Sequence, residues 1–238
     1  MCKSRIFILL IAFAMLFGCT PIPITGSGNM VTQEEPITGF DKVDISYSFD
    51  VNISRGESFS VVIRADDNLV EYLQVVKQGG TLKIGLDPNR DYTIRNATME
   101  ADVTMPELTG LDLSSSSHAT ITGFKSTKAL SVDLSSSSSL EGDIETGDVS
   151  IDLSSSSEMR LTGSGGDAII DISSSSELDL SEFAVENASV NASSSSTVTV
   201  NASGRLDVDA SSSSDVYYLE NPTLGEIDTT SGSSVEPK

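Results

Sequence analysis

Short stretches of alternating apolar and polar residues recur along the second half of the chain, and each is followed by a run of serines. A typical copy reads Ile151-Asp152-Leu153, then Ser154 to Ser157, and then a second alternating stretch in which Met159 and Leu161 are apolar. Alternation with a period of two predicts a β-strand with one buried face. Each copy therefore predicts two strands that are joined by the serine run.

The copies are evenly spaced. The runs begin at positions 114, 135, 154, 173, 193, 211 and 230, and the last one is degenerate, with Thr230 and Gly232 in place of serines. A period near 20 residues is typical of stacked repeats, and about 19 residues at ~3.3 Å each give roughly 60 Å of chain, enough for one circuit of a solenoid.

We therefore predict an all-β fold, a single-stranded parallel β-helix (β-solenoid) with rungs of about 19 residues. In the alternative architecture each copy is a hairpin of a sandwich or propeller. That arrangement is disfavoured because two-residue turn signals such as Asn-Gly are missing between the predicted strands.

The local conformation of the serine runs stays open at this stage. Serine tracts are usually flexible linkers, but the alternation resumes after each run, so the runs belong to the stack. If the backbone stays extended, Ser115 and Ser117 point to the core while Ser114 and Ser116 point outward. If the run turns a corner, its alternation does not predict which serines point inward.

Residues 31–108 are poor in serine runs and predict a β-rich capping region. They contain several short strands, a helical turn at 69–73 and a hairpin around Gly79 and Gly80. Residues 44–48 echo the later repeats and predict a degenerate first coil. The expected organisation is a signal peptide at 1–18, a tether at 19–30, the capping region at 31–108, the repeats at 109–234 and a tail at 235–238.

The first residues carry a targeting signal. Lys3 and Arg5 precede an apolar run at 6–17, which is short for a membrane-spanning helix and typical of a secretory signal. Residues 16–19 (Leu-Phe-Gly-Cys) resemble a bacterial lipobox, which implies cleavage before Cys19 and acylation of its thiol. An ordinary signal peptide with an incidental cysteine is the alternative.

Lipidation of Cys19 would leave the mature chain without a thiol, since the other cysteine, Cys2, lies in the signal. Disulfides and thiolate metal sites are then excluded. A lipid with several acyl chains anchors a protein firmly without spanning the membrane. Because Thr20 rather than an aspartate follows the cysteine, we expect an outer-membrane lipoprotein, on either face of that membrane.

The chain is strongly acidic, with 14 basic and 35 acidic residues and a formal charge of −21. This balance argues against nucleic acid as a partner and against electrostatic docking to anionic lipids. A solvated acidic surface that keeps the protein soluble is the simplest interpretation.

One aspartate occupies the same position in nearly every repeat, two residues before the serine run, and Asn191 takes its place once. If the coils stack in register, neighbouring carboxylates would lie ~5 Å apart and repel by roughly 1 kcal/mol per pair. Hydrogen bonds from the following serine run would offset this and make the row structural. A cation such as Ca²⁺, or a glycan, is the alternative partner, although single acids lack the multi-acid pattern of calcium-binding β-rolls. The row comprises Asp112, Asp133, Asp152, Asp171, Asp209 and Asp228.

The sequence offers no catalytic constellation, no metal site and no cofactor motif. His118 is the single histidine, and the other repeats have Ser, Glu, Thr or Asp at its position. No Gly-x-Ser-x-Gly elbow or phosphate-binding loop occurs, and the acids are dispersed rather than paired as in glycosidases. We therefore predict that the protein is not an enzyme.

Several short motifs, in their order along the chain, resemble the putative auto-transporter adhesin, head GIN domain family of Bacteroidetes envelope proteins. The resemblance covers residues 26 to 234 and implies a β-helical fold and an envelope location, with no catalytic residues to transfer. This sequence has serine where relatives often have a glycine in the run. The motifs are Gly26-Ser27-Gly28-Asn29, Gly39-Phe40 before Val43-Asp44-Ile45, Phe49-Asp50-Val51 with Arg55-Gly56, Asp67-Asn68-Leu69, Gly80-Thr81-Leu82-Lys83-Ile84 and Pro106-Glu107-Leu108.

The expected function is that of a lipid-anchored, non-enzymatic cell-envelope protein, an adhesin or interaction scaffold with a glycan or protein ligand. The alternatives are a carbohydrate-active β-helix enzyme and a purely structural component of envelope assembly.

Overall fold

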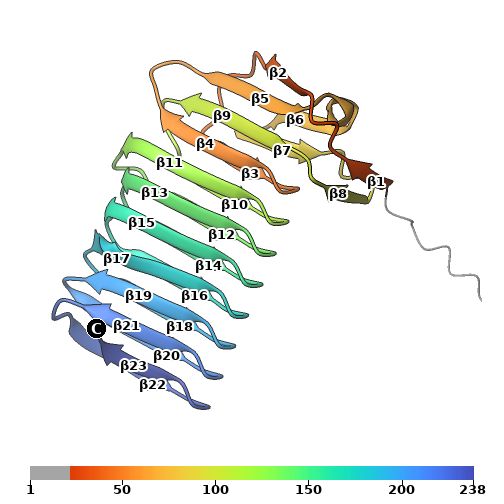
Figure 1. Cartoon of the computed structure of the whole chain (residues 1–238). Coiled ribbons are helices and arrows are strands. Elements are labelled where there is room, and N and C mark those ends of the chain that lie inside the picture. Colours follow the sequence, from red (N-terminus) through yellow and green to blue (C-terminus); the bar gives the residue numbers. More distant parts are fainter. Residues whose placement is uncertain (1–21) are drawn as a thin grey trace, which may run out of the picture.

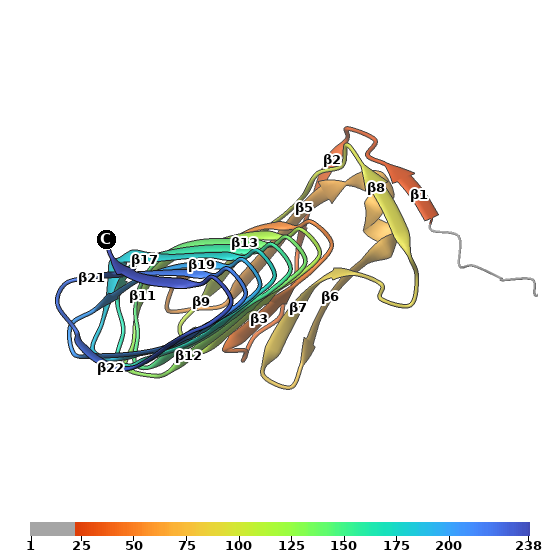
Figure 2. The ribbon, with the colours of Figure 1, turned by 90° about the horizontal axis from the view of Figure 1, so that it is seen from below.

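The computed structural model describes residues 22–238, and it is almost entirely β. The expected signal peptide and the cysteine at position 19 lie outside the described residues. The strands form a flattened solenoid whose coils are stacked along one axis (Figure 1) and nearly superimpose when viewed from below (Figure 2). The prediction of an all-β parallel β-helix is confirmed.

Each coil contributes one strand to each of two facing sheets, here called sheet 1 and sheet 2. In the repeats, sheet 1 contains β10 (Gly110–Leu113), β12 (Leu130–Leu134), β14 (Val149–Leu153), β16 (Ala168–Ile172), β18 (Ala188–Ala192), β20 (Arg205–Ala210) and β22 (Thr223–Thr229). Sheet 2 contains β11 (His118–Lys125), β13 (Ser139–Glu145), β15 (Glu158–Ser164), β17 (Glu177–Val185), β19 (Thr197–Ala202), β21 (Asp215–Leu219) and β23 (Ser234–Pro237).

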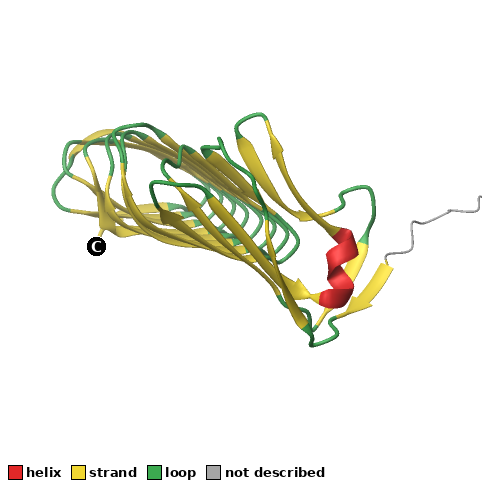
Figure 3. Ribbon diagram, turned by 90° about the horizontal axis from the view of Figure 1, so that it is seen from above, coloured by secondary structure: helices red, strands yellow, loops and turns green. Residues whose placement is uncertain are grey.

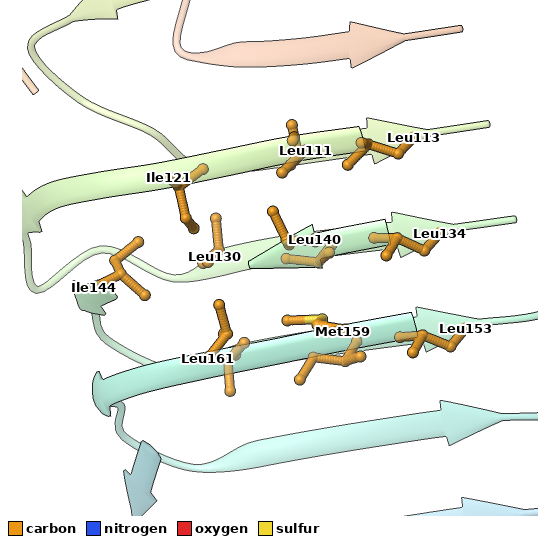
Figure 4. Close-up of a cluster of buried hydrophobic side chains, with 14 of the residues drawn as sticks. Leu111, Leu113, Ile121, Leu130, Leu134, Leu140, Ile144, Leu153, Met159 and Leu161 are labelled. Carbon is orange, nitrogen blue, oxygen red and sulfur yellow. The ribbon is translucent and has the colours of Figure 1, made fainter. Parts of the chain in front are cut away.

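Successive coils pair in parallel and in register, so equivalent side chains form rows along the stack. Val132, Ile151 and Ile170 are consecutive partners in sheet 1, and all three are buried. The inward residues of both sheets interdigitate between the sheets, as Figure 4 shows for the coils between Leu111 and Leu161. Because no coil has a core of its own, each is stabilised by the apolar surface of its neighbours.

The serine runs turn corners. The second and third serines of each complete run have positive φ angles, for example 58° at Ser155 and 64° at Ser156, so the extended alternative is wrong. Ser115, expected to point inward in that alternative, is exposed. Such left-handed positions normally favour glycine. Here the corners are held by coil-to-coil backbone bonds, such as the one from the Ser156 amide to the Ser174 carbonyl (2.9 Å).

The fourth serine of each run is buried, and its hydroxyl group stabilises the corner by hydrogen bonding. The hydroxyl of Ser157 shares its proton between the carbonyl of Ser154 (2.9 Å) in its own corner and that of Leu134 (3.1 Å) in the preceding coil. Buried hydroxyls are stable only when they are hydrogen-bonded, and a serine satisfies this requirement at the smallest volume. The equivalent buried residues are Ser117, Ser138, Ser176, Ser196 and Ser214.

The first coil of the stack lies within the capping region. β3 (Lys42–Ile45) pairs with β10, and β4 (Asp50–Arg55) pairs with β11. Between them, Tyr47 and Ser48 have φ angles of 63° and 58° and reproduce the serine corner. The expected degenerate first coil is therefore present, with Tyr47 in the place of the second serine.

The chain between the first and second coils (residues 56–109) forms most of the remaining capping strands, which extend both sheets at the outer side of the first coil. β7 (Thr81–Leu86) pairs with β3 and β9 (Met99–Met105) pairs with β4. Beyond them lie β6 (Leu73–Gln78), β5 (Ser60–Asp66) and β2 (Met30–Glu34), together with the 3₁₀-helix η1 (Asp67–Tyr72), the red element in Figure 3. The core is thus covered at this end.

Two segments expected to lie outside the stack form strands. β1 (Ile22–Thr25), inside the predicted tether, pairs with β8 (Tyr92–Arg95), and Ile24 is buried against the core. Residues 235–237 of the predicted tail belong to β23, which pairs with β21. Between residues 22 and 238, no helix is long and apolar enough to cross a membrane.

Candidate binding face

The outer face of sheet 1 carries the aspartates that the sequence analysis singled out. Parallel pairing places Asp112 beside Asp133, Asp133 beside Asp152, and Asp152 beside Asp171. The row continues through Asn191 to Asp209 and Asp228. All of these side chains are exposed. One carboxylate per coil therefore points to solvent at the strand spacing of ~4.8 Å.

Serines lie beside the aspartates in three of the repeat strands, two positions earlier along the chain; β10 has Gly110 there, and β20 and β22 have Asp207 and Glu226. Ser131 and Ser150 are in-register partners in neighbouring coils, and Ser189 holds the same position two coils further on. Ile169 holds this position in β16 with a side chain that is 58% exposed. The face thus presents carboxylate acceptors next to hydroxyl groups on a flat, regularly spaced surface.

The aspartates of this row have few partners inside the protein. In the described part of the chain none of the six lies within 4 Å of a lysine or arginine nitrogen, and Asp171 alone accepts a side-chain hydrogen bond, from Asn191 (3.0 Å). The expected hydrogen bonds from the serine runs do not form, because the fourth hydroxyls turn inward and bind backbone carbonyls. That part of the structural interpretation is wrong.

Two aspartates of the row, Asp112 and Asp152, have raised pKa values. Loss of solvent around the carboxyl, followed by repulsion from Asp44 and Asp133, raises the pKa of Asp112 to about 6. Loss of solvent and the charges of Asp133 and Asp171 also raise the pKa of Asp152. Loss of solvent and neighbouring like charges both favour the neutral form of these two acids.

Basic residues stand at the capped end of the same face. Lys83 on β7 is in register with Asp44 and forms an ion pair with it. Lys42 lies over Gly110, where a Cβ atom would come within 3.1 Å of the lysine side chain. Together with Asp112 and Asp133 they line a depression of about 370 Å³. The sequence did not reveal these lysines as part of the face, because Lys83 is 39 residues from its partner Asp44 and Lys42 is 68 residues from its partner Gly110. The alignment of residues 44–48 with the serine repeats was the available signal.

The outer face of sheet 2 differs because many of its charges are paired. Arg160 contacts Glu182 (2.6 Å), Arg64 contacts Asp102 (2.6 Å), and Lys125 pairs with Glu145. These residues come from different strands, so the pairs cross-link neighbouring strands of the sheet.

His118 also lies on the outer face of sheet 2, as expected. Its Nδ1 atom is 2.8 Å from the hydroxyl of Ser139 in the next coil, and Asp50 is its in-register partner in the preceding coil. This order resembles a Ser-His-Asp arrangement, but no hydrogen bond joins Asp50 to the imidazole, and the backbone amides beside Ser139 are used in the sheet. A nucleophile would need both an oriented imidazole and free oxyanion donors.

Metal coordination is not supported by clustered ligands. In residues 22–238, no three His, Cys, Asp or Glu side chains converge in a way that could hold a metal ion. The aspartates form a line rather than a cluster, since each coil contributes one carboxylate.

Comparison with solved structures shows that this fold is shared. Three crystal structures are similar along the whole stack: a putative adhesin from Bacteroides fragilis (16% identity, TM-score 0.82, 90% of this chain and 100% of that chain), a putative lipid binding protein from Parabacteroides distasonis (22%, 0.75, 91% and 99%) and a putative adhesin from Parabacteroides merdae (16%, 0.66, 91% and 99%). No curated protein matches the sequence.

A family model covers most of the chain. It matches residues 39–222, which include the first coil, the inserted capping strands and the repeats up to the last coil. The match spans more than half of the 238 residues, and it agrees with the resemblance inferred from the short motifs. The chain belongs to the family described as putative auto-transporter adhesin, head GIN domain.

Proposed function

We propose that the protein is a non-enzymatic adhesin or interaction scaffold of the cell envelope, and that it binds a glycan or protein through the outer face of sheet 1. The row of unpaired, in-register carboxylates carries this proposal. Ionised groups without internal partners cost free energy in the folded state, and contact with hydroxyl, amide or basic groups of a ligand would offset that cost. Ser131, Ser150 and Ser189 beside the aspartates add hydroxyl donors in three of the coils.

The family description and the names of two similar structures support adhesion as the broad class, since both are described as putative adhesins. The envelope location rests on the signal sequence and on Cys19. Replacing Cys19 with Ser should move the protein from the membrane fraction to the soluble periplasmic fraction. Continued partition into membranes would contradict lipid anchoring.

Binding can be tested with two variants of equal charge change. Asp133, Asp152 and Asp171 are replaced by Asn on sheet 1, and Glu141, Glu158 and Glu177 are replaced by Gln on sheet 2. Both are compared with the wild type on glycan arrays and in pulldowns from envelope extracts. We expect the sheet 1 variant to lose bound ligands that the sheet 2 variant retains.

Equal binding by both variants would contradict the assignment of the face. Blank arrays and no cell binding, with copurification of membrane partners, would favour a purely structural component. Release of reducing ends from envelope polysaccharides by the wild type would favour the enzyme alternative, and the prediction of no catalysis depends on that assay.

A further inference from the structure

The two ends of the stack differ in how well their core side chains are covered. At the capped end, Leu82 and Ile84 of β7 cover the first coil and are 0% and 1% exposed. At the other end, β22 is an edge strand of sheet 1 within the described residues. Its inward-facing Leu224 and Ile227 are 47% and 36% exposed. Their in-register partners one coil earlier are Leu206 and Val208, which are 0% and 3% exposed.

This open end combines three unsatisfied features. The core side chains of β22 lack the next coil, and the outer edge of β22 has no strand paired to its backbone groups among residues 22–238. The aspartate row also ends there, at Asp228, without a basic neighbour within 4 Å in the described structure. Exposed edges of this kind are templates for the addition of a strand.

The capped end shows what satisfies all three features at once. β7 pairs in parallel with β3, with Leu82 opposite Val43, Lys83 opposite Asp44 and Ile84 opposite Ile45. The two apolar residues cover the core side chains of the first coil and are buried in turn by the rest of the capping region, and Lys83 forms an ion pair with Asp44 at the end of the aspartate row. An apolar-basic-apolar strand is therefore the chemical complement of a coil with this sequence pattern.

We propose that β22 is a docking edge for an extended segment of another protein, which adds a parallel strand to sheet 1. The segment has an apolar-basic-apolar pattern, so that its apolar residues lie beside Ile227 and Thr229 and its Lys or Arg pairs with Asp228. This inference goes beyond the proposed function, because it uses the edge of the stack and not the outer face of sheet 1.

The negative charge of this end favours a basic segment over the same end of a second copy of the protein. Residues 211–238 contain five acidic residues and one basic residue. Two such ends brought together would place Glu226 and Asp228 of both copies close to one another, and like charges at an interface oppose association. A basic segment would instead be attracted to these carboxylates.

The test uses the full chain, purified in a mild detergent, and a fluorescent synthetic peptide with the sequence of residues 80–86, the strand β7 without β6, because β6 pairs with the edge of β7 that would face β22. Its control is the same peptide with Lys83→Glu. Fluorescence anisotropy should show saturable binding of the first peptide, which weakens with added salt, and roughly tenfold weaker binding of the control.

Two variants of the protein locate the contact. Asp228→Lys should weaken binding of the original peptide roughly tenfold and should restore binding of the Lys83→Glu peptide. Asp171→Lys, which makes the same change in the middle of the row, should leave both affinities unchanged. Circular dichroism confirms that both variants are folded, and the restored binding of the swapped pair is itself evidence of a folded site.

Three results would overturn the proposal. Equal affinity for the two peptides would show that charge does not select the partner. Equal effects of Asp171→Lys and Asp228→Lys would move the contact from the edge to the face. Concentration-dependent dimers in sedimentation experiments, lost in Asp228→Lys, would show that the edge pairs with a second copy instead.

Discussion

The two outer faces of the stack have the same coil spacing but arrange their charges in opposite ways. On sheet 2, Arg160 in β15 reaches Glu182 in β17, and Lys125 in β11 pairs with Glu145 in β13. On sheet 1, the coils from Asp112 to Asp171 place carboxylate beside carboxylate. Several charges of sheet 2 are thus paired between strands, whereas the aspartates from Asp112 to Asp171 on sheet 1 have no lysine or arginine nitrogen within 4 Å in the portion that the structure describes.

Both charge arrangements depend on the register of the strands, because a slip of one residue in either sheet would exchange its inner and outer faces. The serine corners join the two sheets and carry the bonds that hold each coil to the next. They are therefore the first feature to perturb.

The largest expected effect comes from Ser157→Ala. The buried hydroxyl of Ser157 shares its proton between the carbonyls of Leu134 and Ser154, and its removal should lower the free energy of unfolding by about 1–2 kcal/mol. Urea denaturation of the variant gives this value. Ser156→Ala in the same corner is the control, since that side chain is exposed, and it should change stability by less than ~0.5 kcal/mol. Equal effects would mean that the buried hydroxyls do not hold the corners.

The next effect sharpens the contrast between the faces. Replacing Asp133, Asp152 and Asp171 with Asn removes three like-charge contacts along sheet 1, at roughly 1 kcal/mol each in water before screening. We expect the free energy of unfolding to rise by roughly 1–2 kcal/mol at low salt and the gain to shrink at high salt.

The matched change on sheet 2 should have little effect. Replacing Glu158 and Glu177 with Gln removes one like-charge contact, and replacing Glu141 removes its attraction to Arg160, its in-register neighbour. These changes offset one another. An equal gain in stability from both triple variants would show that net charge, and not the row on sheet 1, opposes folding.

A smaller effect concerns pH. The pKa of Asp112 is about 6 in the folded protein and 3.8 without the fold. Between these values the folded state binds more protons, so this group's contribution to stability is greatest below pH 3.8 and is lost as the pH rises through 6. Because the carboxyl is exposed and screened, we expect less than ~1 kcal/mol. The measurement is the difference in unfolding free energy between wild type and Asp112→Asn at pH 4.5 and 7.0; a constant difference would contradict the assignment.

The smallest effect belongs to the paired charges of sheet 2. Arg160→Gln removes the contact with Glu182, and both side chains are at least half exposed. The free energy of unfolding should fall by no more than ~0.5 kcal/mol, because exposed ion pairs contribute little. A loss above 1 kcal/mol in denaturant titrations would mean that cross-strand pairs hold sheet 2 together.

Much of this architecture could be read from the repeats. The strands on both sides of each serine run, the parallel stacking and the alignment of the aspartates all follow from period-two alternation at a fixed spacing, because equivalent residues of a solenoid must lie side by side. The echo at residues 44–48 correctly predicted a first coil. The insertion of the capping strands between that coil and the second one could not be read locally, since it depends on which distant strands pair.

The sequence by itself determined the solenoid, its coil length and the row of exposed carboxylates, because these depend on local alternation repeated at a constant interval. Only the tertiary structure decided that each serine run is a corner with two left-handed residues and one buried hydroxyl. It also decided that Lys83 ends the aspartate row at one end, while Leu224, Ile227 and Asp228 are uncovered at the other. These features depend on hydrogen bonds and contacts between coils, and a coil's own residues do not specify them.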